Sequence, residues 1–167
     1  KREYVSGESH YYNGKRYILK VITAPSPSRV EIRGKKYLYL NVPAGSSKEK
    51  RQHVMTQWYR NRLKEQIPAL LAKWQPVTGV EVTSWGIKAM KTKWGSCNVR
   101  EGRIWINLEL VKKPAHCIEY ILVHEMVHLL ERRHNDRFIA YMDRFMPQWR
   151  KYKEELNRVI LGHVDWN

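Results

Sequence analysis

Cysteine and long apolar runs are scarce in this chain of 167 residues. Its two cysteines, Cys97 and Cys117, have no CxxC spacing, which argues against a disulfide framework and against a thiolate zinc knuckle. No apolar run approaches the roughly 20 residues that a membrane-spanning helix needs, and no stretch reads as a secretory signal peptide. We therefore expect a cytoplasmic protein that does not cross a membrane.

Internal repeats, low-complexity segments and a glycine-rich phosphate loop are also absent from the sequence. What is present favours a folded globular protein, because seven Trp and ten Tyr supply large apolar side chains despite the high charge. A chain of this length can bury a sizeable core, so we expect one compact unit overall.

Positive charge is concentrated in the first part of the chain, within a formal net charge of +15. Residues 1–100 hold 20 Lys and Arg against 6 Asp and Glu, whereas residues 101–167 hold 11 against 10. This asymmetry predicts an anionic partner for residues 1–100, with DNA or RNA as the leading candidate. The alternatives are a solvated surface that keeps the protein soluble and a docking surface for an acidic protein. Tyrosines that could stack on unpaired bases lie among these cations: Tyr11, Tyr12, Tyr37 and Tyr39.

Residues 1–45 are predicted to form an N-terminal antiparallel β-meander. Asn13-Gly14 separates two runs rich in Tyr, Ile and Val, and this dipeptide suits a type I′ hairpin turn. A second hairpin has Gly34 at its turn, with Ile32 and Tyr37 in the flanking strands. We treat this segment as a subdomain of its own.

A helix is predicted to begin near Lys48 and to open the second unit, residues 46–167. Ser46 and Glu49 match the spacing of a capping box, in which each side chain satisfies a free backbone N–H at the start of a helix. Pro68 is expected to kink or restart this helix, since proline removes a backbone donor.

The rest of the chain predicts a small sheet followed by helices. Strand-like patterns occupy residues 80–97 and 103–110, and a helix is expected from about 115 to 130. Asn135 or Asp136 is expected to cap the next helix, and Pro147 to open the last one. The fold class is therefore α+β, with a β-meander, a central helix, a small sheet and C-terminal helices.

The segment VHEMVHLLERRH, residues 123–134, places polar groups inside an apolar helix. On a helical wheel His124, Glu125 and His128 share one sector beside a nearly continuous apolar wall. Two imidazoles one turn apart can direct ring nitrogens at one zinc ion, and Glu125 can reach a water molecule there without binding the metal. The pattern is the HExxH motif of zinc hydrolases. The competing interpretation, two histidines making ordinary core hydrogen bonds, requires two costly buried imidazoles without a shared partner.

The third zinc ligand is not determined by spacing alone. His134 can return to the metal if the helix unwinds near residues 130–132. Glu131, which neighbours His128 on the wheel, competes with it, as do the more distant Glu154 and Glu155. A catalytic zinc also needs one position open to water.

The combination of KTKWGSCN, RIWINLEL, VHEMVHLLERRHNDRF and MPQWR resembles the YgjP-like metallopeptidase family, and the similarity extends from the first hairpin to the final GHVDW. The resemblance implies a zincin-like domain with one zinc per chain, held by His124, His128 and His134, and Glu125 as the general base. It also implies a protein or peptide substrate. SprT-like and WLM proteases, some of which act on proteins at DNA, have similar ligand spacing.

In the expected mechanism a zinc-activated water hydrolyses the peptide bond, with Glu125 as general base. Residues near these motifs are candidates for binding the peptide. An extended peptide is expected to add to an open sheet edge in the hairpin formed by residues 91–97 and 103–108. Gly95 predicts a close backbone approach near the cleft. Arg137 and Tyr141 are candidates for stabilising the oxyanion because they follow His134 closely. The candidate substrate-binding residues are Trp94, Ser96, Trp105, Asn107, Arg137 and Tyr141.

Two alternative functions would also involve a bound metal ion. The first is a metal-dependent nucleoside-triphosphate pyrophosphatase, a label that some members of the resembled family carry, although phosphoryl chemistry usually uses carboxylate-held magnesium. The second is a nucleic-acid-binding module with a structural zinc. Glu125 argues against it, because a structural site needs no base.

Overall fold

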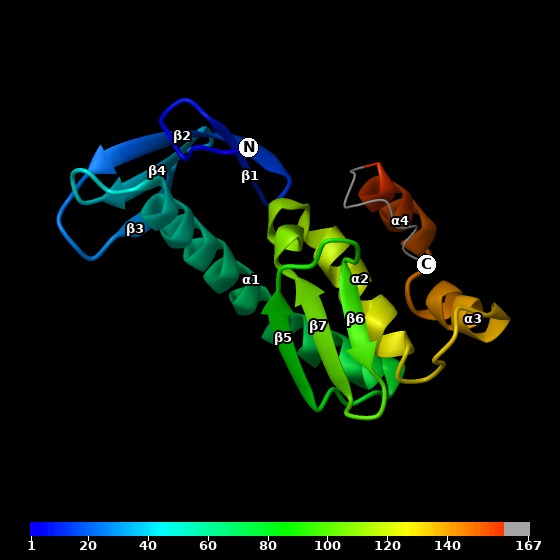
Figure 1. The fold of residues 1–167 in the computed structure, drawn as a ribbon. Coiled ribbons are helices and arrows are strands. Elements are labelled where there is room, and N and C mark those ends of the chain that lie inside the picture. Colours follow the sequence, from blue (N-terminus) through cyan, green and yellow to red (C-terminus); the bar gives the residue numbers. More distant parts are fainter. Residues whose placement is uncertain (159–167) are drawn as a thin grey trace.

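A computed structural model describes residues 1–158 of the chain, so the GHVDW motif lies outside the described residues. One long helix, α1 (Lys48–Thr78), connects two separate sheets (Figure 1). A four-stranded sheet packs near the beginning of this helix, and a three-stranded sheet with three further helices packs near its end. The architecture is α+β, as predicted.

The N-terminal sheet contains β1 (Ser9–Tyr12), β2 (Lys15–Thr23), β3 (Arg29–Arg33) and β4 (Tyr37–Val42). Both predicted hairpins are present, since β1 pairs with β2 and β3 with β4 in antiparallel register. Asn13 and Gly14 have φ angles of 53° and 77°, the left-handed values that the type I′ turn requires.

The prediction of a continuous meander is wrong in one respect. The strand order is β1-β2-β4-β3, so β4 lies between β2 and β3 and runs parallel to β2. Leu38 and Leu40 of β4 are fully buried, whereas β3 has no buried residue. The more apolar strand therefore takes the central place, and the charged strand takes the edge, where its side chains stay hydrated.

Helix α1 begins and continues differently from the prediction. Its N-cap is Ser47, whose hydroxyl accepts from the Lys50 N–H at 3.1 Å, while the Ser46 hydroxyl instead donates to the Pro43 carbonyl. The helix passes through Pro68 without interruption. Burial of neighbouring apolar side chains offsets the lost backbone bond, which costs about 3 kcal/mol. Gly79, with φ of 72°, ends the helix.

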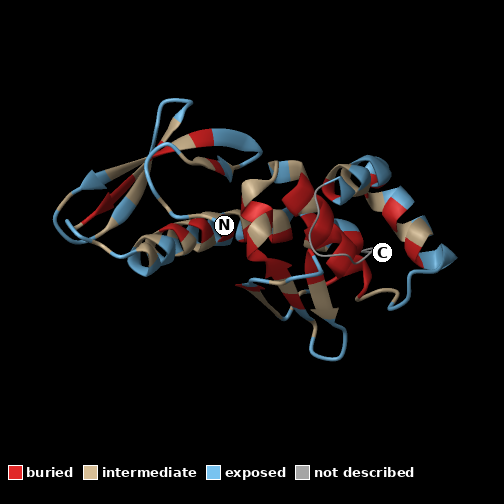
Figure 2. Cartoon of the chain, turned by 45° about the horizontal axis from the view of Figure 1, so that its top comes forward, coloured by how far each residue is buried: buried red, intermediate tan, exposed pale blue. Residues whose placement is uncertain are grey.

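Helix α1 supplies buried residues to both ends of the molecule (Figure 2). Near its beginning the Tyr59 hydroxyl donates to the Tyr11 carbonyl at 2.7 Å, which ties the helix to β1. The turn of the first hairpin also reaches the second unit, because the N–H groups of Asn13 and Gly14 donate to the carbonyls of Val111 and Lys112 at 3.0 Å. The two predicted subdomains are thus in direct contact.

The second sheet contains β5 (Ser84–Lys88), β6 (Gly95–Asn98) and β7 (Arg103–Asn107), in the order β5-β7-β6. The strands are shorter than predicted, and residues 91–94 form a loop rather than part of a strand. Strand β7 is central, parallel to β5 and antiparallel to β6, so residues 103–107 present no free edge. A 3₁₀ helix, η1 (Leu108–Lys112), follows β7 where the alternating pattern had predicted more strand.

Three helices complete the fold: α2 (Ala115–Val127), α3 (Asp136–Phe145) and α4 (Trp149–Asn157). Asn135 caps α3 as predicted, accepting from the Phe138 N–H at 3.0 Å. Helix α2 ends three residues before the predicted limit of 130. Its last turn tightens, with Leu129 and Leu130 donating to the carbonyls three residues earlier.

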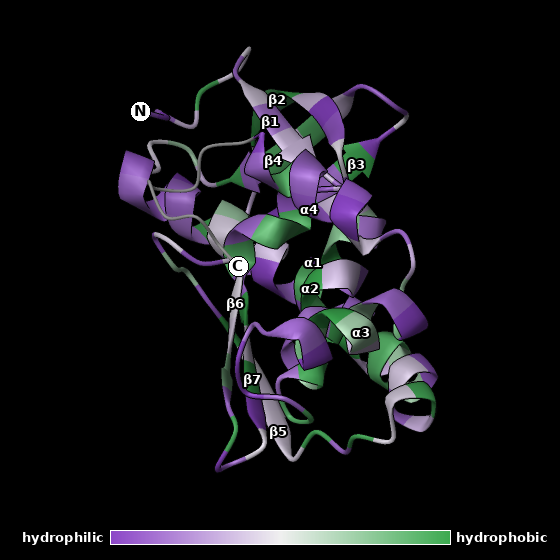
Figure 3. Cartoon of the chain, turned by 90° about the vertical axis from the view of Figure 1, so that its right-hand side faces the viewer, coloured by the Kyte–Doolittle hydropathy of each residue, from purple (hydrophilic) through white to green (hydrophobic). Residues whose placement is uncertain are grey.

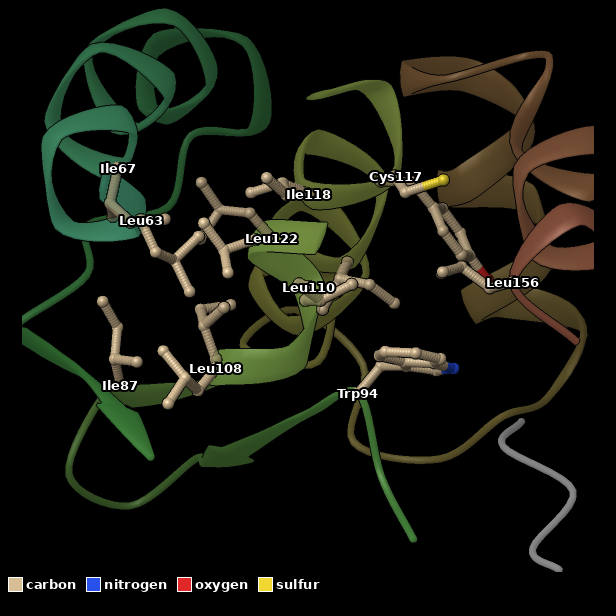
Figure 4. Close-up of a cluster of buried hydrophobic side chains, with 14 of the residues drawn as sticks. Leu63, Ile67, Ile87, Trp94, Leu108, Leu110, Cys117, Ile118, Leu122 and Leu156 are labelled. Carbon is tan, nitrogen blue, oxygen red and sulfur yellow. The ribbon is translucent and has the colours of Figure 1, made fainter. Parts of the chain in front are cut away.

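The main core lies where α1, α2, η1 and the second sheet meet (Figure 4). Helix α2 is buried along most of its length, and Figure 3 shows it among apolar segments in the middle of the molecule. Polar residues in the buried part of this helix lie in a dry environment, which makes them informative. Among the described residues, no helix is both long and apolar enough to cross a membrane.

Candidate metal centre

The final turns of α2 carry His124, Glu125 and His128, with exposed fractions of 3%, 3% and 9%. After His128 the chain leaves the helix and reverses direction before α3 begins at Asp136. This reversal brings His134 back to the two helix histidines. The two histidines on one face of α2 are therefore joined by a third imidazole, which comes from the loop between α2 and α3.

The three imidazoles converge through the same ring atom. Nε2 of His128 lies 3.2 Å from Nε2 of His124 and 2.9 Å from Nε2 of His134, and the remaining pair is 3.2 Å apart. A single ion 2.0–2.1 Å from each nitrogen, the distance that zinc prefers, fits a triangle of this size. The three histidines form the cluster most suited to a metal among the described residues.

The protonation states of these histidines also fit a metal. Nδ1 of His128 lies 3.2 Å from the Glu131 carbonyl, an acceptor, so this nitrogen carries the proton and Nε2 presents a lone pair. Burial lowers the pKa of His128 to about 4, and burial also lowers the pKa of His124 and that of His134. Neutral imidazoles are the form that binds metals. A shared cation would satisfy Nε2 lone pairs that converge at such distances.

The competing carboxylates lie elsewhere. Glu131 accepts a hydrogen bond from the Arg133 N–H at 3.3 Å, and this and other hydrogen bonds hold the pKa of its carboxyl below the usual value. Glu155 pairs with His116 at 2.7 Å and Glu154 with Arg158 at 3.4 Å. The structure therefore brings His134, and none of these three acids, to the two helix histidines.

Phe138 is a site residue that the sequence did not reveal. Its ring centroid lies 4.8 Å from that of His124, 4.7 Å from that of His128 and 5.0 Å from that of His134. The residue is almost completely buried on α3. An apolar ring against all three imidazoles limits their rotation and keeps water from one side of the cluster. Its position one turn after His134 was the available signal.

The side chain of Glu125, on α2, lies against β6 at Gly95. A Cβ atom placed on Gly95 would lie 3.0 Å from Oε2 of Glu125 and 2.9 Å from Ile121, so only glycine fits there. Burial raises the pKa of Glu125 to about 8, and the positive charge of Lys93 opposes this rise. The close approach predicted at the glycine of the WGSC motif is confirmed.

The surroundings of the neighbouring Cys97 disfavour a thiolate. Burial, together with the charge of Glu125, raises the pKa of its thiol to about 12, which keeps it protonated. Cys117 is also a free, buried thiol, with its pKa likewise raised to about 12. Neither thiol is therefore prepared to act as a nucleophile.

The other predicted residues fall into two groups. Trp94 and Asn107 are buried, and the Asn107 amide donates to the carbonyls of Met90 and Lys93 at 3.0 and 2.7 Å. Asn107 thus fixes the loop before β6 and is not free to contact a substrate. Ser96 pairs with Trp105 across β6 and β7 and is partly exposed. Arg137 and Tyr141 share a hydrogen bond on the surface of α3.

Comparison with known proteins shows the family and a similar fold. The model of the YgjP-like metallopeptidase domain matches residues 1–159. The chain is similar in fold to the metallopeptidase zymogen abylysin of Pyrococcus abyssi, with a TM-score of 0.52, 17% identity, and coverage of 58% of this chain and 98% of that one.

A second similar structure is the metallopeptidase zymogen jannalysin of Methanocaldococcus jannaschii, with a TM-score of 0.46, 18% identity, and coverage of 57% and 94%. No curated protein matches the sequence. The match of the family model to nearly the whole chain identifies this protein as a member of the YgjP-like metallopeptidase family.

Proposed function

We propose that the protein is a zinc-dependent peptidase that cleaves peptide bonds within protein or peptide substrates. The observation that carries this proposal is the convergence of three histidine Nε2 atoms, 2.9–3.2 Å apart, beside a buried glutamate. Family membership supports a metallopeptidase in general. The residues that perform each step are inferred from the donor set and its surroundings. Localisation in the cytoplasm stays a prediction, made from the small number and the spacing of the cysteines.

His124, His128 and His134 would hold one zinc ion through Nε2. Zinc held there would act as a Lewis acid on a substrate carbonyl and on a water molecule. Three neutral imidazoles suit zinc better than magnesium or calcium, which prefer oxygen ligands. Phe138 keeps the rings oriented, and the hydrogen bond from His128 Nδ1 to the Glu131 carbonyl fixes the tautomer.

Glu125 would serve as the general base. Its carboxylate accepts the proton of the attacking water while the water oxygen bonds to the carbonyl carbon. It then delivers that proton to the amide nitrogen as the C–N bond breaks. The site suits this role because a water-poor environment raises the proton affinity of Glu125, and the absence of a side chain at Gly95 leaves room for the carboxylate.

A peptide substrate would add to the free edge of β6. Strand β6 is an edge strand whose other side is paired with β7, and it passes directly over Glu125. Backbone hydrogen bonds along such an edge bind an extended peptide irrespective of its sequence. Ser96 and Trp105 lie on the solvent side of this sheet and could contact substrate side chains, while Arg137 and Tyr141 are the candidate oxyanion donors from α3.

Pyrophosphatase activity on a nucleoside triphosphate is the second candidate. Its main support is the excess of Lys and Arg in residues 1–100. The donor set argues against it, because magnesium-dependent phosphoryl chemistry uses carboxylate ligands and the cluster here is made of imidazoles. A nucleic-acid-binding module with a purely structural zinc leaves the buried Glu125 without a role.

Incubation of the zinc-loaded protein with a mixed proteome and, separately, with UTP tests the proposal. Glu125→Gln removes the base while keeping the side-chain shape, so new peptide termini should appear with the wild type and fall by several orders of magnitude with the variant. Zinc content, measured by elemental analysis, should be the same in both proteins. Cleavage of UTP without proteolysis would favour the pyrophosphatase, and equal proteolysis by both proteins would exclude Glu125 as the base.

A further inference from the structure

The N-terminal sheet has one face that no helix covers. Helix α1 packs on the other face, where Tyr12 lies 4.9 Å from Trp58 between ring centroids. Along each strand the side chains alternate, so the residues between the core positions point away from α1. We call this side the outer sheet face. It comprises Ser9, Tyr11, Arg16, Ile18, Lys20, Ile22, Arg29, Glu31, Arg33, Tyr37, Tyr39 and Asn41.

Aromatic rings occupy the middle of the outer sheet face. Tyr37 and Tyr39 lie on the central strand β4, with ring centroids 6.3 Å apart and planes nearly perpendicular. Neither belongs to the hydrophobic core or packs against it, in contrast to Tyr12 and Tyr17 on the opposite face. Tyr11 of β1 adds a third ring that is 44% exposed. Tyr37 and Tyr39 therefore take no part in the core, and a base can stack on them once the cations that lie over their rings turn aside.

Cations surround these rings on the neighbouring strands. The Arg33 guanidinium lies 4.1 Å from the centre of the Tyr39 ring, and the Lys20 ammonium 5.0 Å from that of Tyr37. Lys36, at the turn before β4, lies 5.5 Å from the Tyr37 ring. Glu31, the acidic residue on this face, is paired with Arg29 at 2.9 Å. The outer sheet face therefore carries excess positive charge next to aromatic surface.

We propose that the outer sheet face binds single-stranded RNA. Unpaired bases would stack on Tyr37, Tyr39 and Tyr11, while Lys20 and Arg33 would contact the phosphates on either side. A four-stranded sheet with aromatic residues on its open face is a known arrangement for reading single-stranded RNA. This activity goes beyond the proposed peptidase function and does not depend on it, since no zinc ligand lies on this sheet.

Two features favour a single strand over a duplex or an acidic protein segment. A duplex hides its bases, so it would use the cations and leave the tyrosine rings without contacts. An acidic protein segment would likewise pair with Lys20 and Arg33 but would gain little from aromatic rings. The interleaving of rings and cations on adjacent strands matches a ligand in which aromatic bases alternate with phosphates.

Fluorescence anisotropy with a labelled single-stranded RNA of twelve nucleotides tests the proposal, using the full zinc-loaded chain at low salt. The charge variant Lys20→Gln/Arg33→Gln should weaken binding by roughly tenfold or more and flatten the salt dependence. The ring variant Tyr37→Leu/Tyr39→Leu keeps apolar side chains on β4 and should also weaken binding by roughly tenfold or more. Arg100→Gln/Lys151→Gln removes the same charge from exposed sites of the second unit and should bind like the wild type.

Circular dichroism establishes that each variant is folded, and if the ring variant unfolds, the charge variant and its matched control decide the question. Absence of RNA binding at tens of micromolar would overturn the proposal. So would equal binding of duplex RNA or polyglutamate with no effect of the ring variant, which would indicate a general polyanion or acidic-protein surface. Tighter binding of single-stranded DNA of the same sequence would overturn the choice of RNA.

Discussion

Each of the two sheets has one face covered by a helix and one face open to solvent. Their notable polar groups lie on different faces: the open face in the N-terminal sheet and the covered face in the second sheet. In the N-terminal sheet the side facing α1 is core, formed by residues such as Leu19 and Leu38, and the charged groups point to solvent. In the second sheet the polar groups of interest lie on the covered side, where β6 meets Glu125 of α2. The solvent side of a sheet suits recognition of a large charged partner, whereas the covered side can shift pKa values and exclude water.

The largest expected effect is on zinc affinity, and it follows substitution of His134, the proposed ligand from the loop after α2. His134→Ala should weaken zinc binding by more than about 100-fold, because loss of a direct ligand exceeds the typical effect of losing a supporting contact. Zinc affinity is measured by competition with a chelator of known strength. Binding of RNA to the outer sheet face should not change.

Glu131→Ala is the matched control, since this acid lies three residues before His134 and its carboxylate bonds to the backbone instead of the cluster. It should weaken zinc binding only slightly. If Glu131→Ala lowered the affinity more than His134→Ala, the assignment of the third ligand would be wrong.

Gly95→Ala should affect activity next most strongly. The added methyl group would collide with Ile121 and Glu125, and a displacement of the base by about 1 Å can lower the rate by roughly 100-fold. Zinc content should stay the same, which separates this effect from metal loss. Peptidase activity per bound zinc is the measurement.

Gly34→Ala serves as the comparison in the other sheet. A Cβ at Gly34 meets no atom within 4 Å, but its φ of 62° makes alanine unfavourable by about 1–2 kcal/mol. This variant should lower stability and leave activity per folded molecule unchanged. Equal loss of activity in both glycine variants would show that Gly95 acts only through stability.

Asn107→Ala should destabilise the second unit by roughly 2 kcal/mol. The side chain is fully buried, and its removal leaves the carbonyls of Met90 and Lys93 without this donor. The free energy of unfolding in urea gives the measurement. The loop that precedes Gly95 should also become more mobile, so faster amide exchange at residues 90–94 is the expected accompanying change. Unchanged exchange there would contradict the positioning role.

Tyr59→Phe should have the smallest effect, a loss of about 1 kcal/mol in the free energy of unfolding. The substitution removes only the hydrogen bond from the buried hydroxyl to the Tyr11 carbonyl. It tests how firmly α1 holds the N-terminal sheet. Tyr141→Phe, on the surface of α3, gives the control for losing a partly exposed hydroxyl. Equal effects of the two substitutions would mean that this link contributes little.

Local patterns in the sequence predicted the two hairpins, the N-cap of α3 at Asn135 and the shared sector of His124 and His128 on α2. Each of these depends on residues close together in the chain. The insertion of β4 between β2 and β3 could not be predicted in this way, because strand pairing depends on burial across the whole sheet. Likewise, Pro68 alone indicates a break, and only the packing of α1 at both ends shows why the helix continues.

The candidate metal centre also has features that the local sequence predicted and features that it did not. HExxH predicted two ligands and a base, which stay predictions, and the approach of His134 to His124 and His128 needed either the family resemblance or the structure. The part played by Phe138 could not be inferred, because its contacts to the three histidines arise from the packing of α3 against α2. Asn107 was predicted to bind substrate, but its burial and hydrogen bonds give it a positioning role instead.

The continuity of α1 has a consequence for substrate choice. This helix has 31 residues and a length of roughly 45 Å, with the outer sheet face near one end and the metal centre near the other. A small peptide can occupy only one of the two sites. If the outer sheet face binds RNA as proposed, an RNA-associated protein would occupy both, and tethering at the first site would raise the effective concentration of its peptide bonds at the second. The gain depends on the length and stiffness of the substrate segment between the two contacts, so the helix would select substrates by reach as well as by sequence.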